Sequence, residues 1–282
     1  MIVVTGATGN VGRALVERLV AEDQPVRALT RNPGRAAFPS GAEVARLELD
    51  RPAHLLDGAT KLFLHIQATG DRTGGLLDAA RAAGVRHVVM LSSGIIDEGA
   101  DDETHPIRIW HATAEQQVRD SGLEWTFLRP ISFATNALQW APQIRVGDTV
   151  HGPFAEACTA PIHEDDIAAV AARALIDRGH SGAVHRLTGP EPVTTTEQIT
   201  TIGHTLGRDL RFIEVPPDQV GPDLFPHVPP SMLQGILKSF AATAGVHPEI
   251  TTTVETITGT PARTMSSSGS SVTIRKTLPA TL

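Results

Sequence analysis

The sequence contains no tyrosine, a single cysteine and few aromatic residues of any kind, which make up 4% of its 282 residues. The one cysteine, Cys158, has no second cysteine in the chain with which to form a disulfide. A chain of this length without disulfides is typical of a reducing compartment. We expect Cys158 to be a small buried hydrophobic residue and not a nucleophile.

Long apolar segments are missing too. The most apolar stretch of helical period, residues 167–176, is interrupted by Arg173 and falls short of the ~20 residues that a membrane span needs. The chain starts at Met1 and reaches a glycine-rich loop at Gly6, which leaves no room for the basic and apolar regions of a secretory signal. We therefore expect a cytoplasmic protein that does not associate with membranes.

An excess of basic residues is also absent. The chain has 24 Lys and Arg against 31 Asp and Glu, a formal net charge of -7 at pH 7. Such a balance gives no broad basic surface of the kind that binds nucleic acid. Hydrophobic residues make up 41% of the chain, which is enough for a packed core. We expect a monomer or a homodimer that acts on a small-molecule substrate.

Short runs of β-branched residues alternate with alanine-rich segments of helical period, which is the pattern of βαβ units. The sequence therefore predicts an α/β fold, with a Rossmann-type parallel sheet flanked by helices and a small C-terminal α/β lobe. The expected strands are residues 2–5, 26–30, 44–49, 61–66, 87–92 and 125–128, and the expected helices are residues 11–22, 74–83, 110–121 and 165–177.

A glycine-rich loop, Gly6-Ala7-Thr8-Gly9-Asn10-Val11-Gly12, lies between the first expected strand and the first expected helix. Its glycines allow a tight turn and the close approach of a pyrophosphate, while the helix start offers free N–H groups and a positive dipole end. The loop therefore predicts a dinucleotide site. Its expected cofactor-binding residues are Gly6, Thr8, Gly9, Asn10, Val11 and Gly12.

The residue at the end of the second strand indicates whether the site prefers NAD or NADP, because an acidic side chain there binds the ribose 2′-hydroxyl of NAD. This chain has Arg31 at that point, and Arg13 and Arg35 are expected nearby. Cationic side chains favour a 2′-phosphate, so we expect NADP(H). NAD(H) stays open, since surface arginines are often only solvated. Asp50, ending the third strand, is expected to hold the adenine amino group, and Ile66 is included in the cofactor site.

The chain is expected to divide into three parts. Residues 1–150, with parts of 160–190, form the NAD(P)-binding domain, residues 191–258 a small lobe that covers the substrate, and residues 259–282 a tail rich in Ser and Thr. Thr194 and Glu197 have the spacing of a capping box, which predicts a helix through about Leu206. Residues 210–215 then predict a strand.

A series of segments occurs in a specific order along the chain: the glycine loop, then residues 26–33, 87–93, 115–130, 166–168, 188–191 and 206–208. In this series the chain resembles the atypical short-chain dehydrogenases of the NmrA-like group, which includes isoflavone-reductase-like and quinone-reductase-like proteins. The match spans roughly residues 1 to 215. The resemblance implies a nicotinamide site that faces a cleft beneath the C-terminal lobe, with Ser92, Ser93, Pro130 and Phe133 near the reactive ring.

The chain departs from this group at the usual proton donor. Short-chain dehydrogenases usually carry Tyr-x-x-x-Lys on the helix before the sixth strand, where the lysine lowers the pKa of the tyrosine. Counting from Glu115 places Ile107 at the tyrosine position and His111 at the lysine position. Reduction of a simple ketone therefore lacks its standard proton source.

Two replacements are open. His111 is expected to titrate nearest physiological pH and to donate to a substrate oxygen or to the nicotinamide ribose; the alternative is an ordinary hydrogen-bonded histidine. Ser92 or Ser93 is expected to hold a carbonyl, and the alternative is a strand-end cap. A quinone or other conjugated acceptor eases the need for a donor, because its negative charge is delocalised and water protonates it later.

Phe133, Asn136 and Trp140 follow the sixth strand at near-helical spacing and are candidates for the substrate pocket. Packing within the lobe is the alternative. Residues 163–166 carry groups that bind metals, but acidic residues at a helix start more often cap the helix. No metal site is expected.

These observations favour an NADP(H)-dependent oxidoreductase that transfers hydride to a small conjugated, quinone-like or carbonyl substrate, without the usual Tyr-Lys pair. Two alternatives share the glycine loop. One is a regulator that senses NADP(H) without turnover, and the other is a tailoring enzyme of isomerase type on the same fold.

Overall fold

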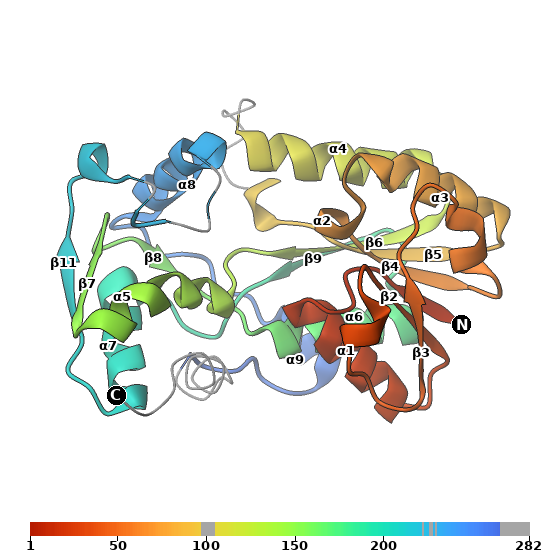
Figure 1. Cartoon of the computed structure of the whole chain (residues 1–282), viewed down its shortest axis with the longest axis horizontal. Coiled ribbons are helices and arrows are strands. Elements are labelled where there is room, and N and C mark those ends of the chain that lie inside the picture. Colours follow the sequence, from red (N-terminus) through yellow and green to blue (C-terminus); the bar gives the residue numbers. More distant parts are fainter. Residues whose placement is uncertain (97–104, 222, 226–227, 229, 266–282) are drawn as a thin grey trace.

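The computed structural model describes residues 1–96, 105–221, 223–225, 228 and 230–265. Its centre is a seven-stranded sheet in the order β3-β2-β1-β4-β5-β6-β9, in which each pair of neighbours is parallel (Figure 1). The strands are β1 (Ile2–Val4), β2 (Val26–Thr30), β3 (Ala42–Arg46), β4 (Lys61–His65), β5 (His87–Leu91), β6 (Glu124–Pro130) and β9 (Ala183–Leu187). The predicted Rossmann-type sheet is confirmed.

Helices cover both faces of this sheet (Figure 1). One face packs against α1 (Asn10–Ala21), α6 (Glu164–Ile176) and α9 (Thr253–Thr258), and the other against α3 (Thr73–Ala82) and α4 (Pro106–Asp120). Short α2 (Ile66–Thr69) follows β4 directly. The stripe of Val11, Leu15 and Leu19 on α1 is buried against the sheet, as its spacing predicts.

Two edge strands differ from the expected pattern. The sequence predicts the third strand at residues 44–49, but β3 begins and ends earlier. β3 lies at the sheet edge and is largely exposed, and an exposed strand leaves a weaker pattern in the sequence. Asp50 therefore lies beyond the end of β3 and not at its last position. β9, at the opposite edge, is half-exposed and was not expected as a strand.

A lobe lies beside the sheet domain and combines two separate stretches of the chain. Its elements are α5 (Ala141–Val146), β7 (Thr149–Gly152), β8 (Cys158–Thr159), β10 (Val193–Thr194), α7 (Thr195–Leu206), β11 (Arg211–Glu214) and α8 (Pro230–Thr243). β7 pairs parallel with β11, and β8 pairs antiparallel with β10. Buried Ile144 and Val150 share a hydrophobic cluster with Ile199 and Leu210. The division at residue 191 stays a prediction, but the packing joins residues on both sides of it.

The start of α7 has the capping box that the sequence predicts. The Thr194 hydroxyl accepts the Glu197 N–H at 3.1 Å, and the Glu197 carboxylate accepts the Thr194 N–H at 2.7 Å. Glu197 itself is exposed, so its part in beginning the helix is this local hydrogen bonding. Ile199 and Ile202 further along α7 are buried in the lobe.

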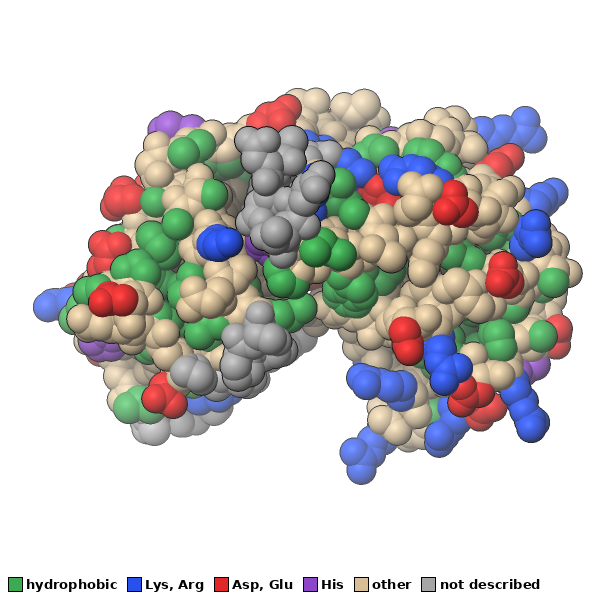
Figure 2. Space-filling view, turned by 90° about the horizontal axis from the view of Figure 1, so that it is seen from above, with side chains coloured by type: hydrophobic (Ala, Val, Ile, Leu, Met, Phe, Trp, Pro, Cys, Tyr) green, Lys and Arg blue, Asp and Glu red, His purple; other side chains and the backbone are tan. Residues whose placement is uncertain are grey.

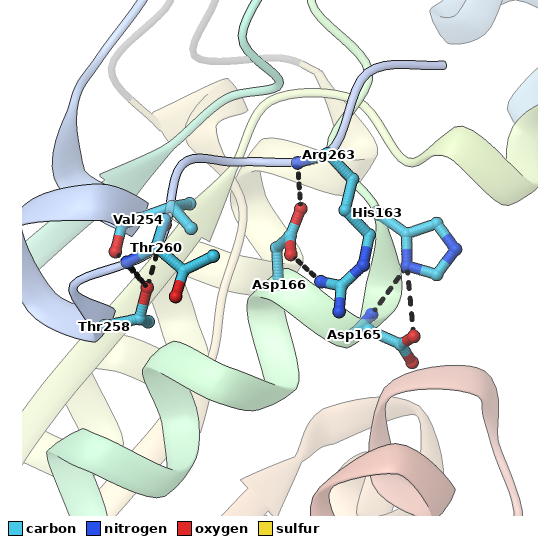
Figure 3. Close-up of polar contacts among 7 residues, drawn as sticks. All are labelled: His163, Asp165, Asp166, Val254, Thr258, Thr260 and Arg263. Carbon is cyan, nitrogen blue, oxygen red and sulfur yellow. Dashed lines mark hydrogen bonds and ion pairs between the residues drawn. The ribbon is translucent and has the colours of Figure 1, made fainter. Parts of the chain in front are cut away.

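The segment after α9 is held on the start of α6 (Figure 3). The Asp166 carboxylate accepts the Arg263 backbone N–H at 2.8 Å and also binds the Arg263 guanidinium. His163 caps α6 by accepting the Asp165 N–H at 3.0 Å, so the capping interpretation of this acidic segment is confirmed. Met265 is buried in the lobe, and residues 266–282 of the expected tail lie outside the described residues.

Candidate active site

The glycine loop makes a tight turn between β1 and α1. Gly6 has a positive φ of 63°, and a Cβ at Gly12 would lie 2.2 Å from the Gly6 carbonyl oxygen. No side chain caps the start of α1, and its first turn has no acidic residue. An uncapped helix start with glycines around it is suited to the phosphates of a dinucleotide. The residues present fit the cofactor that the loop predicts.

Thr5 fixes this loop to the neighbouring strand. Its hydroxyl donates to the Phe63 carbonyl at 3.1 Å and accepts the His65 N–H at 2.8 Å. The carboxyl ends of β1 and β4 are thereby held together at the point where the strand order reverses. Ligands of open parallel sheets bind in the crevice at such a point. Figure 2 shows the surface hollowed between the lobe and the sheet domain.

Cationic side chains lie beyond the end of β2. Arg31 is exposed directly after the strand. Arg13 of α1 donates to the Ala37 carbonyl at 2.6 Å, with its guanidinium 5.3 Å from the centre of the Phe38 ring. These contacts place Arg13 beside the loop that follows β2. Arg35 is exposed in a short helical turn there.

The adenine side of the expected site contains an ion pair. Asp50 is bound to Arg72 at 2.8 Å, and its carboxylate is 83% exposed. Ile66 is buried at the start of α2, immediately after β4. The cofactor roles of Arg31, Asp50 and Ile66 stay predictions.

A buried carboxylate lies between α4, β5 and β6. Glu115 is 1% exposed. Its Oε1 accepts the Ser92 hydroxyl at 2.6 Å and the Arg129 Nε at 2.9 Å, and its Oε2 accepts Arg129 Nη2 at 2.6 Å and Arg119 Nη2 at 2.9 Å. Two guanidinium groups thus compensate one buried charge. This network fixes the α4 face that carries His111, one turn before Glu115.

His111 and His65 come from distant parts of the chain and interact. Burial, with a smaller contribution from the His65 charge, lowers the pKa of His111 to about 4, against an opposing effect of Glu115. Burial also lowers the pKa of His65. Both Nδ1 atoms are buried without a hydrogen-bond partner within the described residues. At neutral pH His111 is therefore an uncharged imidazole, which differs from the expectation that it titrates near physiological pH.

Ser92 and Ser93 directly follow β5, and Pro130 ends β6. Ser92 is buried, and its hydroxyl hydrogen is used by Glu115, so Ser92 does not also donate to a substrate. The Ser93 hydroxyl accepts the Ile95 N–H at 3.3 Å and has no acceptor within the described part of the chain. Ser93 is therefore better suited than Ser92 to hold a carbonyl.

The three residues expected to line the substrate pocket do not lie together in the structure. Phe133 is partly buried where the chain leaves β6, and Asn136 is exposed just after it. The Glu164 carboxylate accepts the Thr135 N–H at 3.0 Å and fixes this segment on α6. Trp140 is instead buried in the lobe, where it lines a small pocket with Phe212, Phe225 and Phe240. Trp140 therefore lies in the lobe core, apart from Phe133 and Asn136.

Sequence reasoning missed His65, Arg108 and the Glu115 network. His65 had one available signal, its place at the end of a strand next to the glycine loop. Glu115 and Arg129 had none, because their contact depends on how α4 lies on β6. The catalytic and substrate roles of the named residues stay predictions.

Comparison with known proteins identifies the family. Residues 6–178, more than half of the chain, match the model of a family described as NAD(P)H-binding. The chain belongs to this family. The predictions of an NmrA-like resemblance and of an NAD(P)H-dependent reductase are confirmed by the relatives that follow.

Two curated relatives match along nearly the whole chain. The (4-alkanoyl-5-oxo-2,5-dihydrofuran-3-yl)methyl phosphate reductase of Streptomyces griseus is 40% identical over 275 residues, 93% of this chain and 94% of the relative. The NAD(P)H azoreductase of Xenophilus azovorans is 32% identical over 288 residues, 94% and 95% of the two chains. An Escherichia coli NADPH-dependent quinone oxidoreductase has the same fold, with a TM-score of 0.80, 24% identity and coverage of 95% and 98%.

No helix within the described residues is long and apolar enough to span a membrane. The cytoplasmic location and the choice between monomer and homodimer stay predictions.

Proposed function

We propose that this member of the family is an NADPH-dependent reductase of conjugated acceptors, such as quinones, enones or unsaturated lactones. The observation that carries the proposal is the uncharged imidazole of His111, whose buried Nδ1 has no hydrogen-bond partner within the described residues, in a chain that has no tyrosine. The relatives support it, since one is named for reduction of an oxo-dihydrofuran and another for reduction of azo compounds.

Among the described residues, His111 and Ser93 offer hydrogen bonds to the acceptor, and neither is a strong acid. When bound, the nicotinamide supplies a hydride. A neutral imidazole retains one N–H, which His111 would donate to an acceptor oxygen as negative charge develops there. Ser93 offers a second donor. In a conjugated acceptor this charge is spread over several atoms, so protonation by water follows without a dedicated acid.

The preference for NADPH is part of the proposal. Arg31 and Arg13 supply positive charge beyond β2, where no acidic residue follows the strand directly. A 2′-phosphate is bound well by guanidinium groups. Arg31→Asp should raise the Kd for NADPH roughly 10- to 100-fold, because charge-assisted hydrogen bonds are lost, and Arg178→Asp on an exposed residue serves as the control. Tighter wild-type binding of NADH than of NADPH would contradict this part.

The activity is tested by following NADPH oxidation with three acceptors: menadione, the phosphorylated alkanoyl-oxo-dihydrofuran, and cyclohexanone. We expect turnover of the conjugated acceptors and little or none of the simple ketone. His111→Phe should lower kcat/KM roughly 10²- to 10³-fold, the effect of losing an oxyanion donor, while His204→Gln on an exposed histidine of α7 keeps the wild-type rate. Equal efficiency with cyclohexanone, or no turnover of any acceptor, would overturn the proposal.

A further inference from the structure

Arg108 is a cationic side chain that the proposed reaction does not use. It lies in the first turn of α4, and its Nε is buried without a hydrogen-bond partner within the described residues. A guanidinium N–H removed from water is unfavourable unless an acceptor satisfies it. The unsatisfied donor therefore points to a ligand.

Arg108 shares one face of α4 with His111, the residue that the proposed reaction uses. Arg108, His111 and Glu115 follow one another at intervals of three and four residues, which puts them on one face of α4. This is the face that meets β5 and β6 through Glu115. Arg108 therefore lies one turn before His111, toward the start of the helix.

The lobe closes over this part of α4. His105, directly before the helix, has its Nε2 3.1 Å from the Gly235 carbonyl oxygen of α8. A Cβ at Gly235 would lie 3.2 Å from the same ring nitrogen, so the two helices approach closely here. Figure 1 shows α4 and α8 meeting above the sheet. The start of α4, three residues before Arg108, therefore lies against α8 of the lobe.

Charge around Arg108 is not balanced within the described residues. The first turn of α4 has no acidic residue. Glu115, the carboxylate on the same face, has both oxygens occupied by Arg129, Arg119 and Ser92. His111 is neutral. Within the residues that the structure describes, Arg108 therefore has no acidic partner and lies one helical turn before the uncharged imidazole of His111.

We infer that Arg108 binds an anionic group of the substrate, a phosphate monoester or a carboxylate, while His111 contacts the oxygen of the acceptor. The inference rests on the proposed reductase function and specifies its substrate class. A guanidinium offers paired N–H donors that match phosphate or carboxylate oxygens. The anion would satisfy the buried Nε and orient the conjugated carbonyl toward the sheet.

The test compares two substrates that differ in one group: the (4-alkanoyl-5-oxo-2,5-dihydrofuran-3-yl)methyl phosphate and its dephosphorylated alcohol. The wild type should prefer the phosphate in kcat/KM. Arg108→Gln should lower this preference about 10- to 100-fold, as expected for loss of a charge-assisted hydrogen bond. Arg108→Lys should retain part of it, and Arg178→Gln on an exposed residue should retain all of it.

Other outcomes of this experiment distinguish a substrate-binding Arg108 from one that binds the cofactor or only stabilises the fold. Reduction of both substrates with the same ratio in wild type and Arg108→Gln would overturn the inference and leave the reductase function intact. A raised Kd for NADPH in Arg108→Gln would assign Arg108 to the cofactor and also overturn it. An unchanged ratio with lower stability to urea would show a structural ion pair instead. No turnover of either substrate or of menadione would refute the proposed function itself.

Discussion

Lowering the pH should destabilise the protein through His111. Its pKa is about 4 in the folded protein, because burial disfavours the charged imidazole, whereas the ordinary pKa of histidine is 6.5. Between these values the unfolded chain binds a proton that the folded chain does not. The contribution of His111 to the free energy of unfolding is therefore full above pH 6.5 and falls as the pH drops toward 4.

The two pKa values set the size of the effect. The full difference corresponds to about 3 kcal/mol, and the part lost between pH 7.5 and pH 5.0 is about 2 kcal/mol. Urea denaturation of the protein without cofactor at both pH values measures it. His111→Gln removes the titrating group and should reduce the pH-dependent loss by this amount.

The comparison of variants isolates His111 from other titrating groups. His87 and the carboxylates that do not interact with His111 are present in both proteins, so their contributions cancel in the difference. His204→Gln, on an exposed histidine, should lose as much stability on acidification as the wild type. An identical loss in His111→Gln and wild type, within the error of the extrapolation, would refute the assignment of a neutral buried imidazole.

Three further changes follow from single contacts. Glu115→Gln should lower the free energy of unfolding by about 3 kcal/mol, since it leaves buried guanidinium charge uncompensated. Glu17→Gln, on the exposed side of α1, is the control. A loss below ~1 kcal/mol for Glu115→Gln in urea denaturation would contradict the network. Gly12→Ala should weaken NADPH binding about 10-fold or more in fluorescence titration, because its Cβ would lie 2.2 Å from the Gly6 carbonyl oxygen. Gly34→Ala, where a Cβ meets nothing within 4 Å, should bind NADPH as tightly as the wild type. Thr194→Ala should destabilise the protein by about 1 kcal/mol through loss of the capping box, and unchanged thermal unfolding would show that α7 begins without it.

Local patterns in the sequence were enough to predict the sheet domain. The central strands β1, β4 and β5 are buried on both faces, so their apolar runs are continuous and easily recognised. The glycine loop is equally local, because a tight turn before a helix needs glycine at particular positions. The edge strands β3 and β9 were predicted poorly, since half-exposed residues leave a weak pattern.

The candidate site depended on contacts between distant residues. Ser92, Glu115 and Arg129 meet only because α4 lies across β5 and β6, and no spacing in the sequence encodes that contact. Trp140 has the spacing of a pocket residue, but tertiary packing places it in the lobe.

The sequence by itself determined that this chain binds a nicotinamide dinucleotide and lacks a tyrosine acid, because both follow from the residues present. Only the tertiary structure decided the protonation of His111, because a pKa depends on the water that folding removes and on charges such as His65 that folding brings near. It likewise decided that the Arg108 Nε is buried without a hydrogen-bond partner among the residues that the structure describes.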